Sequence, residues 1–184
     1  TAPPVVELYL SGYARRMVYC RLSNGGLDAA MQPQRANRCQ ALDRRWTVSM
    51  IELLEGGGVA SAKGFLAGAT YAGIKTSGED ALDLAILASE MPAAAAAMFT
   101  TNKVVSPSVT LSRRRVASGS ARAVVVNSGC ANCCVGEQGL RDAEEMTSLA
   151  ASHVGVSGDE VLVCSTGVIG VEIPMALVRQ NIGN

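Results

Sequence analysis

Short apolar runs alternate along this chain with segments of helical repeat, and this alternation restricts the fold more than any other feature of the sequence. The runs at residues 83–89, 122–126 and 161–164 predict strands, the second of them from its β-branched residues. Residues 140–154 repeat their apolar positions at helical spacing, and Ser106-Pro107 is a typical N-cap and first helical position. Strands and helices that alternate in this way predict an α/β or α+β domain.

Glycine-containing segments follow two of the predicted strands. Asn127-Ser128-Gly129 comes after the second strand and Ser165-Thr166-Gly167 after the third, so both segments are predicted to be turns. A turn at the end of a buried strand can direct N–H groups at a substrate, although Ser, Thr and Gly are also ordinary turn residues. Gly155 is placed to cap the helix that precedes it. The Ala-rich residues 93–99 fit either a helix or a strand.

Composition excludes several classes of protein. With 48% hydrophobic and 17% charged residues in 184, the chain is expected to fold, because disordered chains combine low hydrophobicity with a strong charge bias. A formal net charge of zero gives no sign of a nucleic-acid or membrane partner. No apolar run approaches the roughly 18 residues of a transmembrane helix, and the start at Thr1 lacks the features of a signal peptide. We therefore expect an intracellular, cytoplasmic protein.

The first 49 residues differ in amino-acid composition from the rest of the chain. They contain seven Arg and no Lys against three acidic residues, together with the single Trp and three of the four Tyr. From Met50 onward Ala, Val and Gly dominate, so residues 50–184 are predicted to be the folded domain and residues 1–49 an N-terminal extension, artefactual or disordered. The alternative is an organelle transit sequence, which would make the protein organellar.

The cysteines do not predict a disulfide framework or a metal centre. The six Cys lack the regular spacing of a small disulfide-rich domain, which favours reduced thiols. Cys130-Ala-Asn-Cys133 has a spacing that suits zinc, but the chain has no second C-x-x-C and its one His, His153, lies in the predicted helix. No metal site is therefore expected.

Neither the glycine-rich motifs of nucleotide-binding proteins nor a phosphate-binding arginine cluster is indicated by this sequence. The chain has no G-x-G-x-x-G, and Gly64 follows Lys63 where a P-loop needs Ser or Thr, so a nucleotide cofactor is not expected. Three adjacent Arg at 113–115 favour a solvated helix face over a phosphate site.

Six blocks of the sequence, taken in order, resemble the ornithine acetyltransferase family, also called bifunctional glutamate N-acetyltransferase, of arginine biosynthesis. The resemblance covers roughly residues 56–182 and leaves residues 1–49 outside. The blocks are GGGVASAKGFLAGATYAGIK (56–75), DLAIL (83–87), AAAMFTTNKV (95–104), AVVVNSGCAN (123–132), GEQGLRDAEEM (136–146) and VLVCSTGVIGVEIPM (161–175).

The resemblance implies a catalytic role for the segment after the third strand. In this family the Thr-Gly of that segment forms the oxyanion hole, which here means the hydroxyl of Thr166 and the backbone N–H of Gly167. The implied reaction is a ping-pong transfer of acetyl from N-acetylornithine to glutamate, with acetyl-CoA as a further donor in bifunctional members and no other cofactor. The implied fold is an α/β sandwich, of which this chain is an incomplete part.

The resemblance also implies a partner. Family members cut themselves between an Ala and a Thr downstream of the oxyanion segment, and the exposed Thr is the nucleophile. This chain contains no such downstream motif, so it resembles the leading part of the α subunit, with a β subunit from the same precursor and an α2β2 heterotetramer as the expected assembly. We expect the isolated chain to be inactive, and prone to associate through surface that the missing part covers.

Three residues depart from the family pattern N-S-G-N-A-N-A-C-T-G. Cys130, Cys133 and Val135 replace Asn, Ala and Thr, which places the polar contacts of that loop in doubt. Two other functions stay open on the residues alone. One is a non-catalytic module in which the segments at Asn127 and Thr166 bind a small anion, and the other is a thiol-based or metal-binding protein that uses Cys130, Cys133 and Cys134.

Overall fold

The computed structural model describes residues 57–75 and 81–184, and they form a mixed α/β domain, as predicted. The predicted boundary at Met50 and the extension 1–49 lie outside the described residues. No helix in the described part of the chain is long and apolar enough to span a membrane. In chain order the elements are the 3-10 helix η2 (Val59–Ser61), β1 (Phe65–Thr70), β2 (Leu84–Ala94), α1 (Pro107–Val116), β3 (Ser120–Cys130), α2 (Gly136–Val154), the 3-10 helix η3 (Gly158–Glu160), β4 (Val161–Val168) and α3 (Met175–Asn181).

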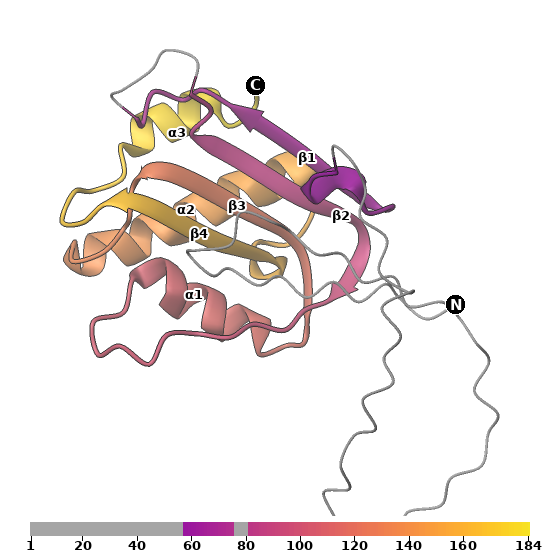
Figure 1. Cartoon of the computed structure of the whole chain (residues 1–184), viewed down its shortest axis with the longest axis horizontal. Helices are drawn as coiled ribbons and strands as arrows, with labels where there is room; N and C mark the ends of the chain where they lie inside the picture. The colour runs from indigo at the N-terminus through magenta and orange to yellow at the C-terminus, as the bar shows by residue number, and fades with distance from the viewer. Residues whose placement is uncertain (1–56, 76–80) are drawn as a thin grey trace, which may run out of the picture. The chain divides into compact units, whose positions relative to one another are not determined.

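One four-stranded sheet organises the domain, in the order β1-β2-β3-β4 (Figure 1). The first three strands pair antiparallel, whereas β4 runs parallel to β3. A parallel neighbour requires a long crossover, and α2 supplies it by passing behind β3 and β4 in Figure 1. The carboxyl ends of β3 and β4 therefore lie side by side at one edge of the sheet.

The core lies between the sheet and α2. Val125 of β3 and Val161 of β4 are fully buried, as are Ala143, Met146 and Ala150 on one face of α2. These α2 positions recur every three or four residues, which is the spacing that predicted the helix. Complete burial of a side chain the size of Val or Met stabilises the fold by about 1.5–3 kcal/mol.

Helix α1 protects the outer edge of β4, whose backbone groups would otherwise lack partners. The α1 side chains that contact β4 lie at intervals of three or four residues, so they share one stripe of the helix; Ser112 and Arg115 bind backbone groups and Ser108 binds the Ser165 hydroxyl. Ser112 is central, because its hydroxyl donates to Val163 O at 2.8 Å and accepts from Val163 N at 3.0 Å. The pairs across this contact are Ser108 with Ser165, Ser112 with Val163, and Arg115 with Val161.

The predicted helices and strands are confirmed, with longer boundaries. Helix α1 begins at Pro107. Ser106 is its N-cap, because the Ser106 hydroxyl accepts a hydrogen bond from the N–H of Ser108. The predicted helix at 140–154 begins earlier, at Gly136, and ends where Gly155 takes the left-handed conformation at φ 75°. The first predicted strand continues to Ala94, whereas residues 95–100 have no regular structure, which resolves the ambiguous Ala-rich segment.

The two predicted turns are wrong. Asn127-Ser128-Gly129 continues β3 to Cys130, and Ser165-Thr166-Gly167 continues β4 to Val168. The reason is that these two segments pair with each other in the parallel ladder, Asn127 opposite Ser165 and Gly129 opposite Gly167. The turn that ends β4 falls at Ile169-Gly170 instead.

Candidate functional site

Thr166 and Gly167, the residues expected to form an oxyanion hole, lie together near the carboxyl end of β4. Both are exposed, although the same strand begins with the fully buried Val161. The structure shows no hydrogen bond to the Thr166 hydroxyl from any described residue. The Thr166 side chain is therefore a hydroxyl presented to solvent by a strand that is anchored at its other end in the core.

Two glycines allow β3 and β4 to approach closely beside Thr166. Gly129 and Gly167 are register partners with φ of 117° and 132°, a region that side chains disfavour. A Cβ on Gly167 would lie 2.2 Å from the carbonyl carbon of Gly129 and 2.3 Å from its oxygen. Any side chain at residue 167 would therefore collide with the neighbouring backbone.

Gly129 is in turn backed by the segment that follows β1. A Cβ on Gly129 would lie 2.9 Å from both Cγ2 and the carbonyl oxygen of Ile74. Asp83 holds this segment in place, because its buried carboxylate accepts Ala72 N at 2.7 Å and Lys75 N at 2.9 Å. Two backbone segments, at Gly129 and at Ile74, thus lie in succession behind Gly167, and Asp83 fixes the second of them.

A second set of polar contacts joins α1 to the strand ends through Asn132. This fully buried residue has φ of 47° and donates from Nδ2 to Ser108 Oγ at 3.0 Å and to Gly139 O at 2.8 Å. The Ser108 and Ser165 hydroxyls are 2.9 Å apart, so the network reaches the residue before Thr166. The resemblance drew attention to Asn132, but sequence reasoning did not identify Ser108 or Ser165 as its partners.

Asn127 does not face the solvent with Thr166. Its side chain is fully buried, and Nδ2 donates to Cys130 O at 2.9 Å. A hollow of about 100 Å³ lined by residues 82–85 and 126–128 lies beside it. Ligand pockets usually measure about 300–1,000 Å³, so this arrangement gives little support to an anion site at Asn127.

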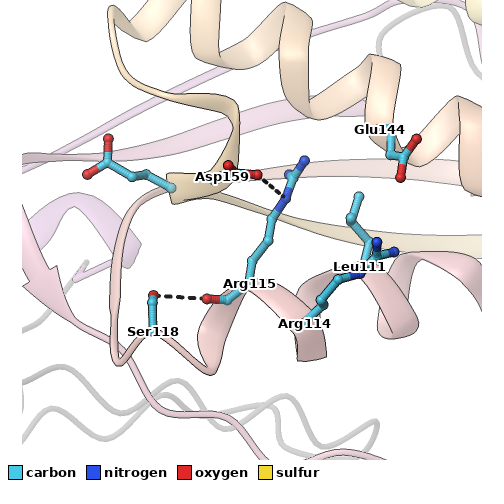
Figure 2. Close-up of a pocket in the computed structure, with 7 residues that line it drawn as sticks. Leu111, Arg114, Arg115, Ser118, Glu144 and Asp159 are labelled. Carbon is cyan, nitrogen blue, oxygen red and sulfur yellow. Dashed lines mark hydrogen bonds and ion pairs between the residues drawn. The ribbon is translucent and has the colours of Figure 1, made fainter.

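A larger cavity of about 550 Å³ lies at the opposite end of β4, around Arg115 (Figure 2). Arg114, Glu144, Asp159 and Glu160 line it as well. Val161 and Thr166 are five residues apart, which in a strand is roughly 16 Å, so this cavity is not part of the candidate site. Its lining mixes both signs of charge, unlike a site made for phosphate.

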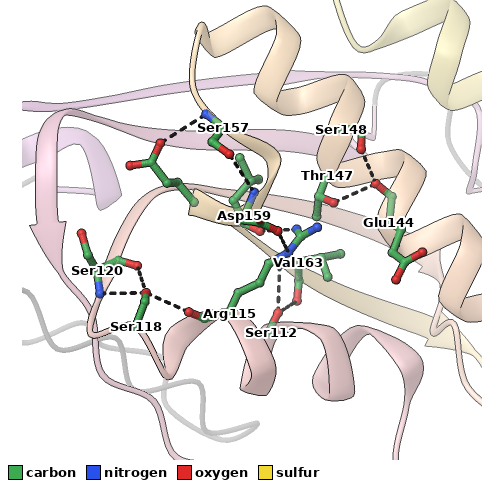
Figure 3. Close-up of polar contacts among 12 residues, drawn as sticks. Ser112, Arg115, Ser118, Ser120, Glu144, Thr147, Ser148, Ser157, Asp159 and Val163 are labelled. Atoms are coloured by element: carbon green, nitrogen blue, oxygen red, sulfur yellow. Dashed lines mark hydrogen bonds and ion pairs between the residues drawn. The ribbon is translucent and has the colours of Figure 1, made fainter.

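Arg115 has a structural role at this end of β4 (Figure 3). Its side chain is 10% exposed and donates to Val161 O at 2.6 Å, with Asp159 3.8 Å from Nε. Burial lowers the pKa of this guanidinium from its ordinary value, and Asp159 opposes that effect. The predicted solvated face therefore holds for the exposed Arg113 and Arg114 and is wrong for Arg115.

The described cysteines are free thiols in different environments. Cys130 is buried, Cys133 and Cys164 are half-buried, and Cys134 is exposed. Burial raises the pKa of Cys130, Cys133 and Cys164 above the ordinary thiol value. In the described ranges no three Cys, His, Asp or Glu side chains are grouped as a metal centre would require.

A buried carboxyl group lies on α2 where it faces the segment after β4. Asp142 is 2% exposed; Oδ1 accepts Gln138 Nε2 at 2.7 Å, and Oδ2 has no hydrogen-bond partner among the described residues. Burial raises the pKa of Asp142, and the nearby carboxylates of Glu172 and Glu145 act in the same direction. Charging this group in the folded protein is therefore unfavourable.

We expect Asp142→Asn to stabilise the chain at neutral pH. A carboxyl whose pKa is raised by folding binds its proton more tightly when folded, so stability is lost as pH rises from the unfolded value, about 3.9, through the folded value. Urea denaturation over a pH series should show the advantage of the variant vanish below about pH 3.9.

The matched control is Glu145→Gln. A hydrogen bond from Arg179 lowers the pKa of Glu145, so its stabilising contribution is present above the unfolded value and is lost as pH falls. Its pH dependence should have the opposite sign. An Asp142→Asn difference that stays constant across the pH series would contradict the titration argument.

Comparison with known proteins gives the family of this chain. The ArgJ family matches residues 66–184. The arginine biosynthesis bifunctional protein ArgJ of Geobacter sulfurreducens is 54% identical over 122 residues, which are 66% of this chain and 30% of that protein. The ArgJ of Thermus thermophilus is 50% identical over 121 residues, 65% of this chain and 31% of that protein. The chain thus spans about a third of the length of these relatives.

Solved structures agree with the sequence comparison. The arginine biosynthesis bifunctional protein ArgJ of Bacillus halodurans matches with a TM-score of 0.67 at 39% identity, over 71% of this chain and 68% of that one. The ornithine acetyltransferase of Mycobacterium tuberculosis, determined in complex with ornithine, matches with a TM-score of 0.66 at 38% identity, over 71% and 69%. Fold and sequence therefore lead to one conclusion: this chain belongs to the ArgJ family of arginine biosynthesis proteins.

Proposed function

We propose that this chain supplies the oxyanion hole for acetyl transfer from N-acetylornithine to glutamate, within a complete protein of the ArgJ family. The Thr166 hydroxyl and the Gly167 N–H would donate to the carbonyl oxygen of the acetyl group. The observation that carries the proposal is the pair Thr166–Gly167 itself, exposed at the end of a strand whose glycine cannot be replaced without a collision.

The physical argument concerns where charge develops. Attack on an acetyl carbonyl turns its oxygen into an oxyanion, and donors held in advance stabilise that charge more than they stabilise the ground state. Rigid donors are needed, because a donor that must reorient during the reaction loses part of this advantage. The stacked backbones behind Gly167 and the contacts of Asn132, Ser108 and Ser165 provide that rigidity.

The remaining chemistry requires groups from the rest of the complete protein. In the proposed ping-pong cycle a threonine hydroxyl attacks the acetyl carbonyl carbon of N-acetylornithine, the C–N bond breaks, and ornithine leaves with the hydroxyl proton. The amine of glutamate then attacks the carbonyl carbon of the acetyl-threonine ester, the C–O bond breaks, and one amine proton returns to the threonine oxygen, which gives N-acetylglutamate and the free hydroxyl. We assign that threonine to the β subunit of an α2β2 assembly, and acetyl-CoA is a second proposed acetyl donor.

Thr166→Ala in the complete protein tests this role. We expect kcat for acetyl transfer from N-acetylornithine to glutamate to fall about 10²-fold, since one oxyanion donor is lost, while KM changes little. Thr166→Ser keeps a hydroxyl and is the matched control, with a loss below about tenfold. Steady-state kinetics with both substrates, on variants with unchanged circular dichroism, gives the comparison.

Two other outcomes would distinguish a wrong oxyanion assignment from a wrong reaction. If the unmodified protein transfers acetyl and Thr166→Ala does so equally well, the oxyanion assignment is wrong but the reaction stands. If the complete unmodified protein transfers no acetyl, the reaction is wrong, and binding of N-acetylornithine or glutamate without turnover would favour the non-catalytic module.

A further inference from the structure

The cavity at the amino end of β4 has the volume of a small-molecule site. It measures about 550 Å³, and such sites usually measure about 300–1,000 Å³. Its walls come from three elements that are separated in the sequence, α1, α2 and η3 (Figure 2). Leu111 of α1 contributes buried apolar surface to the lining. The proposed acetyl transfer takes place near Thr166, at the other end of β4, and does not use this cavity.

Arg115 lines the cavity with most of its hydrogen-bonding capacity unused. Its side chain is 10% exposed, and a guanidinium group has five N–H donors. Within the described part of the chain these donors make one hydrogen bond, from Nη1 to Val161 O, and the buried Nε has no acceptor. Asp159 is 3.8 Å from Nε, which is beyond hydrogen-bonding distance. Since buried polar groups are nearly always hydrogen-bonded, we expect a further acceptor for this guanidinium.

The other charged residues of the lining restrict what that acceptor can belong to. Arg114 lies beside Arg115 on α1, while Glu144 of α2 and Asp159 and Glu160 of η3 line the cavity as well. Two guanidinium groups thus face three carboxylates, and the formal charge of the lining is one negative. The carboxylates oppose binding of a simple anion such as phosphate. A simple cation would leave Arg115 without its acceptor, so a ligand that fits carries both signs of charge.

We propose that this cavity binds a free α-amino acid with a cationic side chain. The α-carboxylate accepts hydrogen bonds from Arg115 and Arg114, because guanidinium and carboxylate groups match in geometry and charge. The cationic side chain pairs with Glu144, whose carboxylate has no hydrogen bond among the described residues. Glu160 is less suited to this role, because it already accepts Ser157 N at 3.2 Å. With one carboxylate and two cationic groups, such an amino acid carries one net positive charge, which balances the lining.

Titration of the 184-residue chain with L-arginine, followed through its amide resonances in NMR, tests this site. We expect saturable shifts for Ser118 and Asp159 at the cavity, and none for Gly167 and Gly170 at the other end of β4. Agmatine lacks the carboxylate and should bind about tenfold or more weakly, because the charged hydrogen bonds to Arg are lost. L-Citrulline keeps the shape without the side-chain charge and should bind about three- to fivefold more weakly, as for an exposed ion pair.

Two substitutions test the assigned contacts. Glu144→Gln should remove the preference for L-arginine over L-citrulline and leave the affinity for L-citrulline unchanged. Arg114→Gln should weaken binding of L-arginine about fivefold, because one exposed partner of the carboxylate is lost. Arg113→Gln is the matched control and should bind L-arginine like the unmodified chain, because Arg113 lies outside the cavity and donates to Thr100 O.

Four results would overturn the proposal. Without saturable shifts from L-arginine the cavity is not a site for this class of ligand, and shifts centred on Gly167 would place the ligand at the other end of β4. Agmatine that binds as tightly as L-arginine would mean that Arg115 takes no carboxylate. Equal losses in Arg113→Gln and Arg114→Gln would assign the effect to overall charge. Acetyl transfer is tested separately by the Thr166 variants, so the failure of one proposal leaves the other standing.

Discussion

Replacing Gly167 with Ala is expected to lower the free energy of unfolding of this chain by about 4 kcal/mol or more. The new Cβ would lie 2.2 Å from the backbone of Gly129, where no flexible side chain can move aside. Either β3 and β4 separate or residue 167 leaves φ of 132°, and both changes disrupt the ladder. Domains have about 5–15 kcal/mol of stability in total, so urea denaturation followed by circular dichroism should show a greatly weakened fold.

Gly170→Ala is the matched control. This residue also has positive φ, 80°, but a Cβ would meet no atom within 4 Å. The expected loss is therefore the conformational penalty alone, about 1 kcal/mol. Equal losses in the two variants would show that backbone conformation, and not the contact with Gly129, explains why residue 167 is Gly.

The periodic elements of this fold could be predicted because their signals are local. Helix α2 has an apolar stripe whose residues contact the sheet, and Gly155 ends it as its position suggested. Ser106 and Pro107 predicted the start of α1 because the N-cap is a local interaction: the Ser106 hydroxyl accepts the N–H of Ser108, two residues later.

The ends of β3 and β4 could not be predicted because they depend on each other. A Gly with positive φ is found in turns as well as in closely paired strands, and Gly129 and Gly167 are far apart in the sequence. Arg115 was misjudged for a similar reason. Its burial follows from the position of β4, which no feature of the Arg run reveals.

The candidate site was identified by resemblance and not by physical chemistry alone. Ser165, Thr166 and Gly167 are ordinary turn residues, and their composition predicts no reaction. The structure adds two things that the sequence did not show. A side chain at residue 167 would collide with the Gly129 backbone, and Ser165 contacts a buried hydrogen-bond network through Ser108. The role of Thr166 and Gly167 in acetyl transfer stays a prediction, for which kinetics on Thr166 variants is the test.

Asn132→Ala is expected to lower the free energy of unfolding by about 3–4 kcal/mol. Two hydrogen bonds from a fully buried amide are lost, with Ser108 Oγ and Gly139 O left without that donor, at about 1–1.5 kcal/mol each. Ala also tolerates φ of 47° less well than Asn, which adds about 1 kcal/mol. Urea denaturation of the chain measures the sum.

Asn132→Gly separates the two contributions, because Gly loses the same hydrogen bonds and adopts positive φ without strain. Its expected loss is about 2–3 kcal/mol, roughly 1 kcal/mol less than that of Ala. Equal losses would mean that the left-handed conformation is not retained, and losses below about 1 kcal/mol in both would mean that the amide bonds contribute little. If the prediction holds, the amide that reaches Ser165 through the Ser108 hydroxyl is one of the groups that stabilise the fold next to Thr166.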